Sequence, residues 1–344
     1  MSAKSVTLRE IARLAGVSTA AVSKALRGEK DISKETQERV KKIAKSLGYS
    51  PNNLAVYLRN GNIKALGVLI PDNTNPYNAL VLKGVEEKAK EYGYTVIIAN
   101  TNSDRKLEQD ILRTMASMKI GGLLAIPTQL QNYKDISIPL VIMSRYPYYA
   151  PYNDNIKNEL GREFDYIVND DFAGEYMAVE HLISRGFRKI FLIAGDNDPF
   201  TAAGVMNLTR LEGYRKALED HGLRFDPNQV YFNILDIHES YQAVKKILEN
   251  AEPPFGLCLY SDYLAMGALS AINDSQMKIP DQVAIVGYDD IENAKYTVPA
   301  ITTINQLKYT MGSESVEHII HSINGQAHIW KKILKPTLVI RDTT

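Results

Sequence analysis

Residues 7–26 read TLREIARLAGVSTAAVSKAL, which predicts two short helices joined by a tight turn. Thr7 and Glu10 have the spacing of a capping box, in which each residue's side chain satisfies a backbone amide at the start of a helix. Gly16 suits the left-handed conformation that ends the first helix, and Ser18 suits the cap of the second. Because a third amphipathic stretch follows, we expect an all-α helix-turn-helix unit.

The outer face of the second helix carries only small residues and one lysine. Small side chains let a helix backbone approach base edges in the major groove, while hydroxyl and ammonium groups can bond to bases or phosphates. We therefore interpret residues 1–50 as a DNA-binding head whose second helix reads the sequence. A small helical bundle that binds protein is the alternative. The predicted DNA contacts of the head are Thr7, Ser18, Thr19, Ala20, Ser23, Lys24 and Arg27.

The charge of the chain is unevenly distributed, although its formal net charge is zero. Residues 1–61 contain 12 Lys and Arg against 5 Asp and Glu, so their net charge is +7 and that of the remainder is −7. A basic head on an acidic body suits contact with a polyanion through the head alone. A pair of solvated charged helices would give the same excess.

The segment after the head reads SPNNLAVYLRNGN over residues 50–62. Pro51 interrupts the chain, and a helix of about seven residues is unstable alone in water. Such a helix could form beside a second copy in a DNA minor groove, where Leu58 could wedge between base steps. We expect Asn53, Ala55 and Leu58 to contact DNA, with a plain linker packed on the head as the alternative.

The rest of the chain alternates apolar, strand-like runs with amphipathic helical stretches. This alternation is typical of parallel sheets with helices on both faces, so the fold class expected for the core is α/β and doubly wound. Two such halves, divided near residue 165, would face each other across a cleft. The expected strands are 65–70, 95–100, 122–127, 140–144, 189–195, 256–261 and 283–289, and the expected helices include 79–92, 107–118, 172–185, 210–221 and 239–250.

The segments VTLREIARLAGVSTAAVSKALRG (6–28), SKETQERVKKIAKSLGYSPNNLA (33–55) and LGVLIPD (66–72) resemble the LacI/GalR family of bacterial transcription regulators. The resemblance continues through GYDD, PAITTINQ and PTLVIRD and so covers essentially the whole chain. It implies a two-lobed, periplasmic-binding-protein-like core and a repressor that binds double-stranded, pseudo-palindromic operator DNA as a homodimer. Leu58 matches the family's intercalating leucine and Ala55 its small neighbour, whereas Lys24 stands where arginine is frequent.

This resemblance implies three functional parts: the head, a hinge over 51–62, and an effector-binding and dimerisation core over 63–344. Within the core we expect an N-lobe over about 63–165 and 292–325. The C-lobe is expected over about 166–291 and 326–344. No heptad repeat is seen near residue 344, so a dimer is expected rather than a tetramer.

Ligands of open α/β sheets bind outside the carboxyl ends of the strands, which points to the polar residues that follow the predicted strands. The resemblance adds Arg210, which matches the family's effector-gripping arginine, and supports Asp289 and Gln306. An arginine, a carboxylate and amides suit a neutral polyhydroxyl ligand, so a carbohydrate effector is expected. For the single acids, a turn or helix cap is the alternative. The predicted effector contacts are Tyr77, Asn78, Arg145, Asp170, Arg210, Asp262, Asp289 and Gln306.

Three features depart from the family pattern or extend it. The segment DNDPFTAAGVMNLT before Arg210 is longer than usual and is expected as a loop, and Leu235 stands where many members carry an aromatic residue. The segment 145–165 contains several tyrosines, which suit either a lid over a sugar or a surface or dimer loop. A phosphocarrier-type protein in place of the small effector is therefore the alternative form of control.

Other function classes lack their signatures. No GxGxxG, Walker A or GxSxG motif occurs, and the six histidines lack metal-ligand spacing, so we expect no enzyme, metal or cofactor. A stand-alone binding module would retain its function without residues 1–61. No apolar run could span a membrane, and the N-terminus does not read as a signal peptide. The single cysteine, Cys258, fits a cytoplasmic protein, and the resemblance implies a bacterial, nucleoid-associated one.

Overall fold

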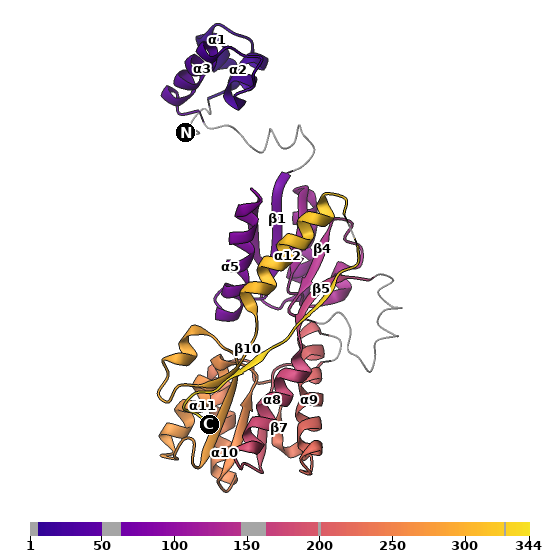
Figure 1. The fold of residues 1–344 in the computed structure, drawn as a ribbon, viewed down its shortest axis with the longest axis vertical. Coiled ribbons are helices and arrows are strands. Elements are labelled where there is room, and N and C mark those ends of the chain that lie inside the picture. The colour runs from indigo at the N-terminus through magenta and orange to yellow at the C-terminus, as the bar shows by residue number, and fades with distance from the viewer. Residues whose placement is uncertain (1–5, 50–62, 146–162, 199–200, 327) are drawn as a thin grey trace. The chain divides into compact units, whose positions relative to one another are not determined.

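The computed structural model describes residues 6–49, 63–145, 163–198, 201–326 and 328–344, and the chain divides into two units, Met1–Ile63 and Lys64–Thr344 (Figure 1). The predictions for Asn53, Ala55 and Leu58, and for most of the tyrosine-rich segment, lie outside the described residues.

The head consists of α1 (Leu8–Ala15), α2 (Thr19–Arg27) and α3 (Lys34–Ser46). Local signals define the first two helices, since Thr7 and Glu10 form a complete capping box and Gly16 ends α1 with a φ of 66°. Ser18 caps α2 by accepting a hydrogen bond from the amide of Ala21. A small apolar core closes the three-helix unit and confirms the helix-turn-helix prediction; it contains Ile11, Ala12, Ala15, Val22, Ala25, Val40 and Ala44.

The first lobe of the core is built on a six-stranded sheet in the order β11-β5-β4-β3-β1-β2. Helices α5 (Pro76–Glu91) and α12 (Lys308–Ile323) pack against each other, and Gly84 and Gly312 allow their backbones to approach closely. A Cβ atom on Gly84 would lie 2.2 Å from the carbonyl oxygen of Tyr309. The strands are β1 (Ile63–Ile70), β2 (Thr95–Asn100), β3 (Ile120–Ala125), β4 (Leu140–Met143), β5 (Asp165–Asn169) and β11 (Lys331–Leu334), with α6 (Arg105–Ser117) and η1 (Leu130–Tyr133) between them in the chain.

The second lobe has a six-stranded sheet in the order β12-β10-β9-β8-β6-β7. Successive residues of its strands face two different apolar clusters, as Leu257 and Cys258 show, so helices cover both faces. Helices α8 (Asp171–Ser184) and α9 (Ala202–Asp220) cover one face, and α10 (Ile237–Asn250) and α11 (Asp262–Asp274) the other. The strands are β6 (Ile190–Ile193), β7 (Val230–Tyr231), β8 (Phe255–Leu259), β9 (Val283–Asp289), β10 (Thr302–Asn305) and β12 (Thr337–Val339), with η3 (Pro227–Gln229) and η4 (Glu292–Lys295) as short 3-10 turns.

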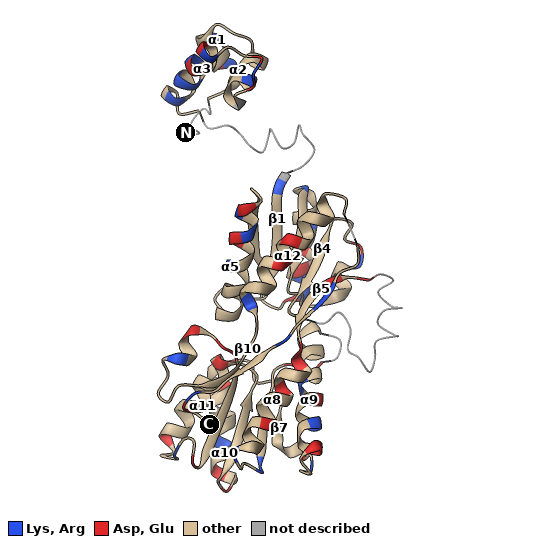
Figure 2. Ribbon diagram, viewed as in Figure 1, with Lys and Arg blue, Asp and Glu red and all other residues tan. Residues whose placement is uncertain are grey.

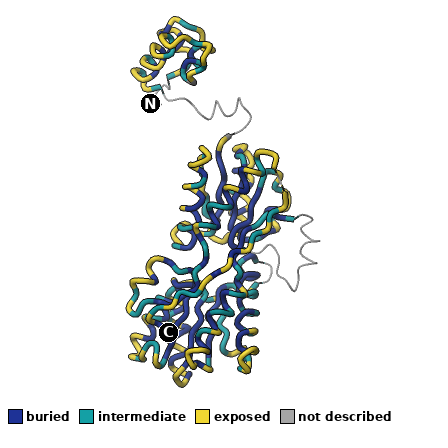
Figure 3. The backbone as a smooth tube through the Cα atoms, in the orientation of Figure 1, coloured by how far each residue is buried: buried dark blue, intermediate teal, exposed yellow. Residues whose placement is uncertain are grey.

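The inner strands of both sheets are mostly buried, whereas the edge strands β2, β7, β11 and β12 are partly exposed (Figure 3). β10 pairs with β9 in parallel and with β12 in antiparallel fashion. The two-lobed α/β fold is thus confirmed, with one antiparallel edge strand. All seven predicted strands and all five predicted helices occur, displaced by a few residues at some ends.

The predicted lobe boundaries were wrong at each place where the chain passes between the lobes. β5 pairs with β4 in the first sheet, so the N-lobe continues to Asn169 instead of ending at 165. The expected N-lobe range 292–325 includes β10, which lies in the second sheet, and the expected C-lobe range 326–344 includes β11, which lies in the first. These strands are short and rich in polar residues, so their backbone pairing, and not their apolar pattern, decides their sheet.

The segment 196–209 was predicted as a loop, but α9 begins within it at Ala202. Thr201 caps the helix by accepting a hydrogen bond from the amide of Gly204 at 2.8 Å. Gly204 lies against the carbonyl of Asp198, where a Cβ atom would be 1.9 Å from the oxygen. The extra residues therefore lengthen a helix at the cleft.

Candidate functional site

The head presents the exposed start of α2 as its candidate DNA-binding surface. Thr19 and Ala20 are exposed, and Ser23 and Lys24 are half-buried. The Lys24 ammonium donates a hydrogen bond to the Asp31 carboxylate, so a DNA contact by this lysine would have to replace that bond. Lys and Arg are also frequent along α3 (Figure 2). The side chain of Arg27 lies outside the described residues.

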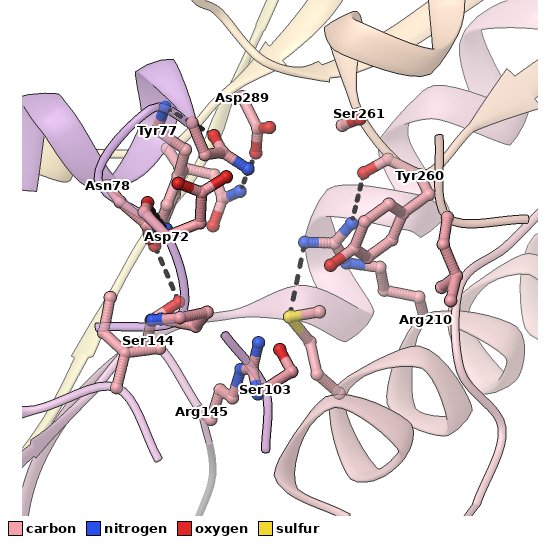
Figure 4. A pocket seen from close by; sticks show the side chains of 16 residues that line it. Asp72, Tyr77, Asn78, Ser103, Ser144, Arg145, Arg210, Tyr260, Ser261 and Asp289 are labelled. Atoms are coloured by element: carbon pink, nitrogen blue, oxygen red, sulfur yellow. Dashed lines mark hydrogen bonds between the residues drawn. The ribbon is translucent and has the colours of Figure 1, made fainter. Parts of the chain in front are cut away.

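A cavity of about 270 Å³ lies between the two lobes of the core, at the carboxyl ends of several strands. This position is where open α/β folds bind ligands. The close-up in Figure 4 shows polar side chains on both of its sides. The lining residues are Pro71, Asp72, Asn75, Tyr77, Asn78, Ser103, Ile126, Ser144, Arg145, Met206, Arg210, Leu235, Tyr260, Ser261, Asp289 and Gln306.

Arg210 extends from α9 into this cavity and is held on several sides. Its Nε donates a hydrogen bond to Asp171 Oδ1 at 2.9 Å. Its Nη1 donates one to the carbonyl of Tyr260 at 2.9 Å (Figure 4). The guanidinium carbon lies 3.6 Å from the centroid of the Tyr288 ring. Because the side chains of Arg210 and Asp171 are only 4% and 1% exposed, this buried ion pair fixes where the remaining N–H donors point.

Asp289 stands at the end of β9 in a left-handed conformation, with a φ of 107°. Its Oδ1 accepts a hydrogen bond from Gln306 Nε2 at 2.5 Å, and Gln306 Oε1 accepts one from Asn169 Nδ2 at 2.7 Å. The ammonium of Lys308 donates to the main-chain carbonyl of Asp289. Burial raises the pKa of Asp289 to about 6, and the charges of Arg210 and Lys308 act against that rise.

The first lobe contributes neutral hydrogen-bonding groups and two charged side chains, Asp72 and Arg145. The Tyr77 hydroxyl and Ser144 Oγ are 2.8 Å apart, and Asn78 Nδ2 donates to the Asp72 carbonyl at 2.7 Å. Arg145 donates a hydrogen bond to the Pro127 carbonyl at 2.8 Å. Burial raises the pKa of Tyr77, so its phenol stays protonated and can serve as a donor.

The sequence of this chain is similar to those of known proteins. Residues 7–52 match the model for bacterial regulatory proteins of the lacI family, and residues 179–344 match that for the periplasmic binding protein-like domain. The HTH-type transcriptional repressor PurR of Haemophilus influenzae (strain PittEE) is 31% identical over 97% of each chain. The chain belongs to the LacI family.

Two further similarities support this membership. The ribose operon repressor of Haemophilus influenzae (strain ATCC 51907) is 32% identical to the LacI-family chain over 98% of each. The lac repressor dimer bound to operator and the anti-inducer ONPF has a similar fold, with a TM-score of 0.85 and 24% identity over 99% of each chain. The protein is therefore a DNA-binding transcription repressor and not an enzyme, as its sequence predicts.

Six of the eight predicted effector residues of this LacI-family protein line the cavity: Tyr77, Asn78, Arg145, Arg210, Asp289 and Gln306. Asp170 does not, because its Oδ1 accepts from the amide of Ala173 and caps α8. Asp262 is fully buried, and its two oxygens accept hydrogen bonds from Thr303 Oγ1 at 2.6 Å and the amide of Ile291 at 2.9 Å. The predictions for these two acids are corrected: both stabilise local structure instead of lining the cavity.

Sequence reasoning missed Met206 and Tyr260 among the lining residues and Asp171 behind them. Tyr260 ends the predicted strand 256–261, so its place at a strand end was an available signal. Met206 precedes Arg210 by one helical turn, but it was assigned to a loop. Leu235 does line the cavity mouth, where its side chain is well exposed.

The parts of the chain that the structure describes show no sign of a membrane span or a metal site. Among those residues, no helix is both long and apolar enough to cross a bilayer. The same residues contain no group of three His, Cys, Asp or Glu side chains placed to hold a metal ion.

Proposed function

We propose that this repressor binds its operator as a homodimer and that a small, uncharged, polyhydroxyl effector in the interlobe cavity sets its DNA affinity. The observation that carries the effector class is that each lobe lines the cavity with one arginine and one aspartate, Arg210 and Asp289 on one side and Arg145 and Asp72 on the other, among neutral amide and hydroxyl groups. Hydroxyl groups both donate and accept, so they can use a cationic and an anionic partner at once. The name of the ribose operon repressor is consistent with such a ligand.

The cavity also limits the size of the effector. Its volume of about 270 Å³ is near the lower end of the roughly 300–1,000 Å³ found for sites of drug-sized ligands, which favours a monosaccharide or a ligand of similar size.

On the DNA side, we propose that Thr19, Ala20, Ser23 and Lys24 contact base edges and that residues 51–62 enter the minor groove as paired hinge helices. An effector that favours one arrangement of the lobes would then favour or oppose pairing of the hinges. Such coupling typically amounts to about 1–3 kcal/mol and is reciprocal between the two sites.

The proposal of a dimer is supported by apolar side chains that are exposed on the second lobe. Tyr296 and Val298 are 76% and 95% exposed, and Tyr263 on α11 is 44% exposed. Exposed apolar groups that gather in one region mark protein contacts more often than free surface. The solved lac repressor that shares this fold is named as a dimer on its operator.

Calorimetry with a panel of neutral sugars, combined with operator binding measured by fluorescence anisotropy, tests the proposal. We expect one sugar to bind in the micromolar range and to shift the operator Kd by about 5–150-fold. Binding of that sugar should be lost in Arg210→Met, while a change of the half-exposed Arg215 on the same helix, Arg215→Met, should retain it. No binding by any sugar, together with a response to a phosphorylated carrier protein, would favour the alternative control.

A further inference from the structure

A buried carboxylate stands directly behind the arginine of the cavity. Asp171 is fully buried at the start of α8, and its Oδ1 accepts the hydrogen bond from Arg210 Nε. Asp171 does not itself line the cavity, so it would act on a ligand through the arginine. The neighbouring Asp170 caps α8, so the two adjacent acids have different surroundings.

The position of Asp171 changes what Arg210 can offer. A guanidinium has five N–H donors, of which Nε–H is directed to Asp171 and one Nη1–H to the carbonyl of Tyr260. Nη2 donates only to the sulfur of Met206, a weak acceptor at 3.8 Å, so three of the five donors have no oxygen acceptor among the described residues. The arginine therefore keeps donors for a ligand while its positive charge is already matched inside the protein.

The other charged side chains at the cavity also include both signs. The carboxylate of Asp289 has Lys308 nearby, whose ammonium donates to the Asp289 carbonyl. Arg145 and Asp72 complete the charged lining residues with one charge of each sign. Glu175, one turn after Asp171 and also buried, adds a further carboxyl group close to Arg210.

We propose that Asp171 is a specificity-determining residue, which makes the cavity select uncharged effectors and reject anionic ones such as sugar phosphates and sugar acids. An anion that reached Arg210 would be attracted only weakly, because the carboxylate of Asp171 lies at hydrogen-bond distance and offsets the positive charge. It would also approach the carboxylate of Asp289 in the same low-dielectric space. A neutral hydroxyl keeps the hydrogen bond without that repulsion.

This proposal rests on the proposed function only in taking the cavity as the effector site. It predicts that removal of the Asp171 charge converts the cavity into an anion site. Asp171→Asn is the appropriate change, because the amide oxygen can still accept the bond from Arg210 Nε. Glu180→Gln is the matched control, since it removes one charge from the exposed side of the same helix.

The experiment uses the full chain at pH 8, above the pKa of Asp171, which burial raises to about 6. Sulfate is titrated against chloride at constant ionic strength, and binding is followed by calorimetry and by the midpoint of thermal unfolding. We expect Asp171→Asn to bind sulfate at least about tenfold more tightly than the wild type or Glu180→Gln, as a unit charge about 8 Å away implies at an effective dielectric constant of about 20. Equal sulfate affinity in all three proteins overturns the proposal.

A second arm compares galactose with galacturonate, and ribose with ribose 5-phosphate, in the wild type and Asp171→Asn. The ratio of anionic to neutral affinity should rise about tenfold or more in the variant, whereas a purely structural role would lower both affinities together. Tighter binding of either anion than of its neutral partner by the wild type contradicts the proposal, even if Asp171→Asn does not fold. If no neutral sugar binds the wild type, the proposed effector class fails, and the sulfate titration still decides the role of Asp171.

Discussion

Replacement of Arg210 by methionine should destabilise the core as well as abolish its response to effector. The change leaves Asp171, which is fully buried, without the cation that bonds its Oδ1 at 2.9 Å. Breaking a buried ion pair from one side typically costs about 3–5 kcal/mol, because the remaining charge stays desolvated. We expect the free energy of unfolding of the core to fall by that amount at pH 8.

The cost of this change should depend on pH in a defined direction. Burial already raises the pKa of Asp171 to about 6, and loss of the arginine removes an interaction that lowers it. The folded variant therefore binds a proton more tightly than its unfolded chain does, and its stability decreases as pH rises through the folded pKa. The loss relative to the wild type should accordingly be smaller at pH 5 than at pH 8.

The double variant Arg210→Met with Asp171→Leu separates the two consequences. Replacing both members of a buried pair by apolar groups is often close to neutral, so the unfolding free energy should return to within about 1–2 kcal/mol of the wild type. Effector binding should remain absent, because the donors of Arg210 are still missing. Urea unfolding followed by circular dichroism measures the first effect and calorimetry the second. A single variant that loses less than about 1 kcal/mol, or a double variant no more stable than the single, would refute this account of the pair.

Three other changes test separate parts of the molecule. Gly84→Ala should lower the unfolding free energy of the core by more than Gly122→Ala in urea denaturation, because its Cβ would lie 2.2 Å from a main-chain oxygen, whereas the Cβ of Gly122 meets the movable end of a side chain. Core stability should decrease between about pH 4 and pH 8, and Asp262→Asn should flatten this slope, since burial raises the pKa of Asp262 to about 8 and the folded state therefore binds the proton more tightly. Leu58→Ala should weaken binding to operator far more than binding to non-specific DNA in anisotropy titrations, because only a kinked central step offers the leucine a place to insert.

Each of these expectations has an outcome that contradicts it. Equal losses in the two glycine variants would mean that α5 and α12 separate readily at their crossing. A pH slope unchanged in Asp262→Asn would assign the titration to other buried carboxyl groups. Equal losses on operator and non-specific DNA would reject the wedge role of Leu58.

The head could be predicted almost completely from the sequence, because its signals are local. The capping box at Thr7 and the left-handed Gly16 act within one helical turn, and both occur in the structure as expected. Several strands of the core were also predictable, since the middle residues of β2 and β9 are apolar and the expected ranges match the bounds of both strands.

The strands near the crossings between the lobes could not be assigned in this way. β10 and β11 are four residues each, read TTIN and KKIL, and pair with strands 16 or more than 160 residues earlier in the chain. Their membership of a sheet depends on backbone hydrogen bonds with distant partners, which leave little trace in a local apolar pattern.

The sequence predicts where the cavity lies, at the carboxyl ends of the strands, but it does not predict every residue that lines it. Asp170 and Asp171 are adjacent acids after a strand, and one residue along a helix turns the side chain by about 100°. The sequence could not show which of the two would reach Arg210, because that depends on where α8 begins. The prediction for Asp262 was wrong for a related reason. Asp262 is the first residue of α11, and its side chain faces Ile291 and Thr303 instead of the cleft.

The order of the strands has a consequence for the synthesis of this protein on the ribosome. Both sheets receive an edge strand from the last residues of the chain, β11 at Lys331–Leu334 and β12 at Thr337–Val339. The three helices of the head contact one another within the first fifty residues and can fold as soon as they emerge. A nascent chain can thus fold its helix-turn-helix head long before either sheet of the core has received its last strand.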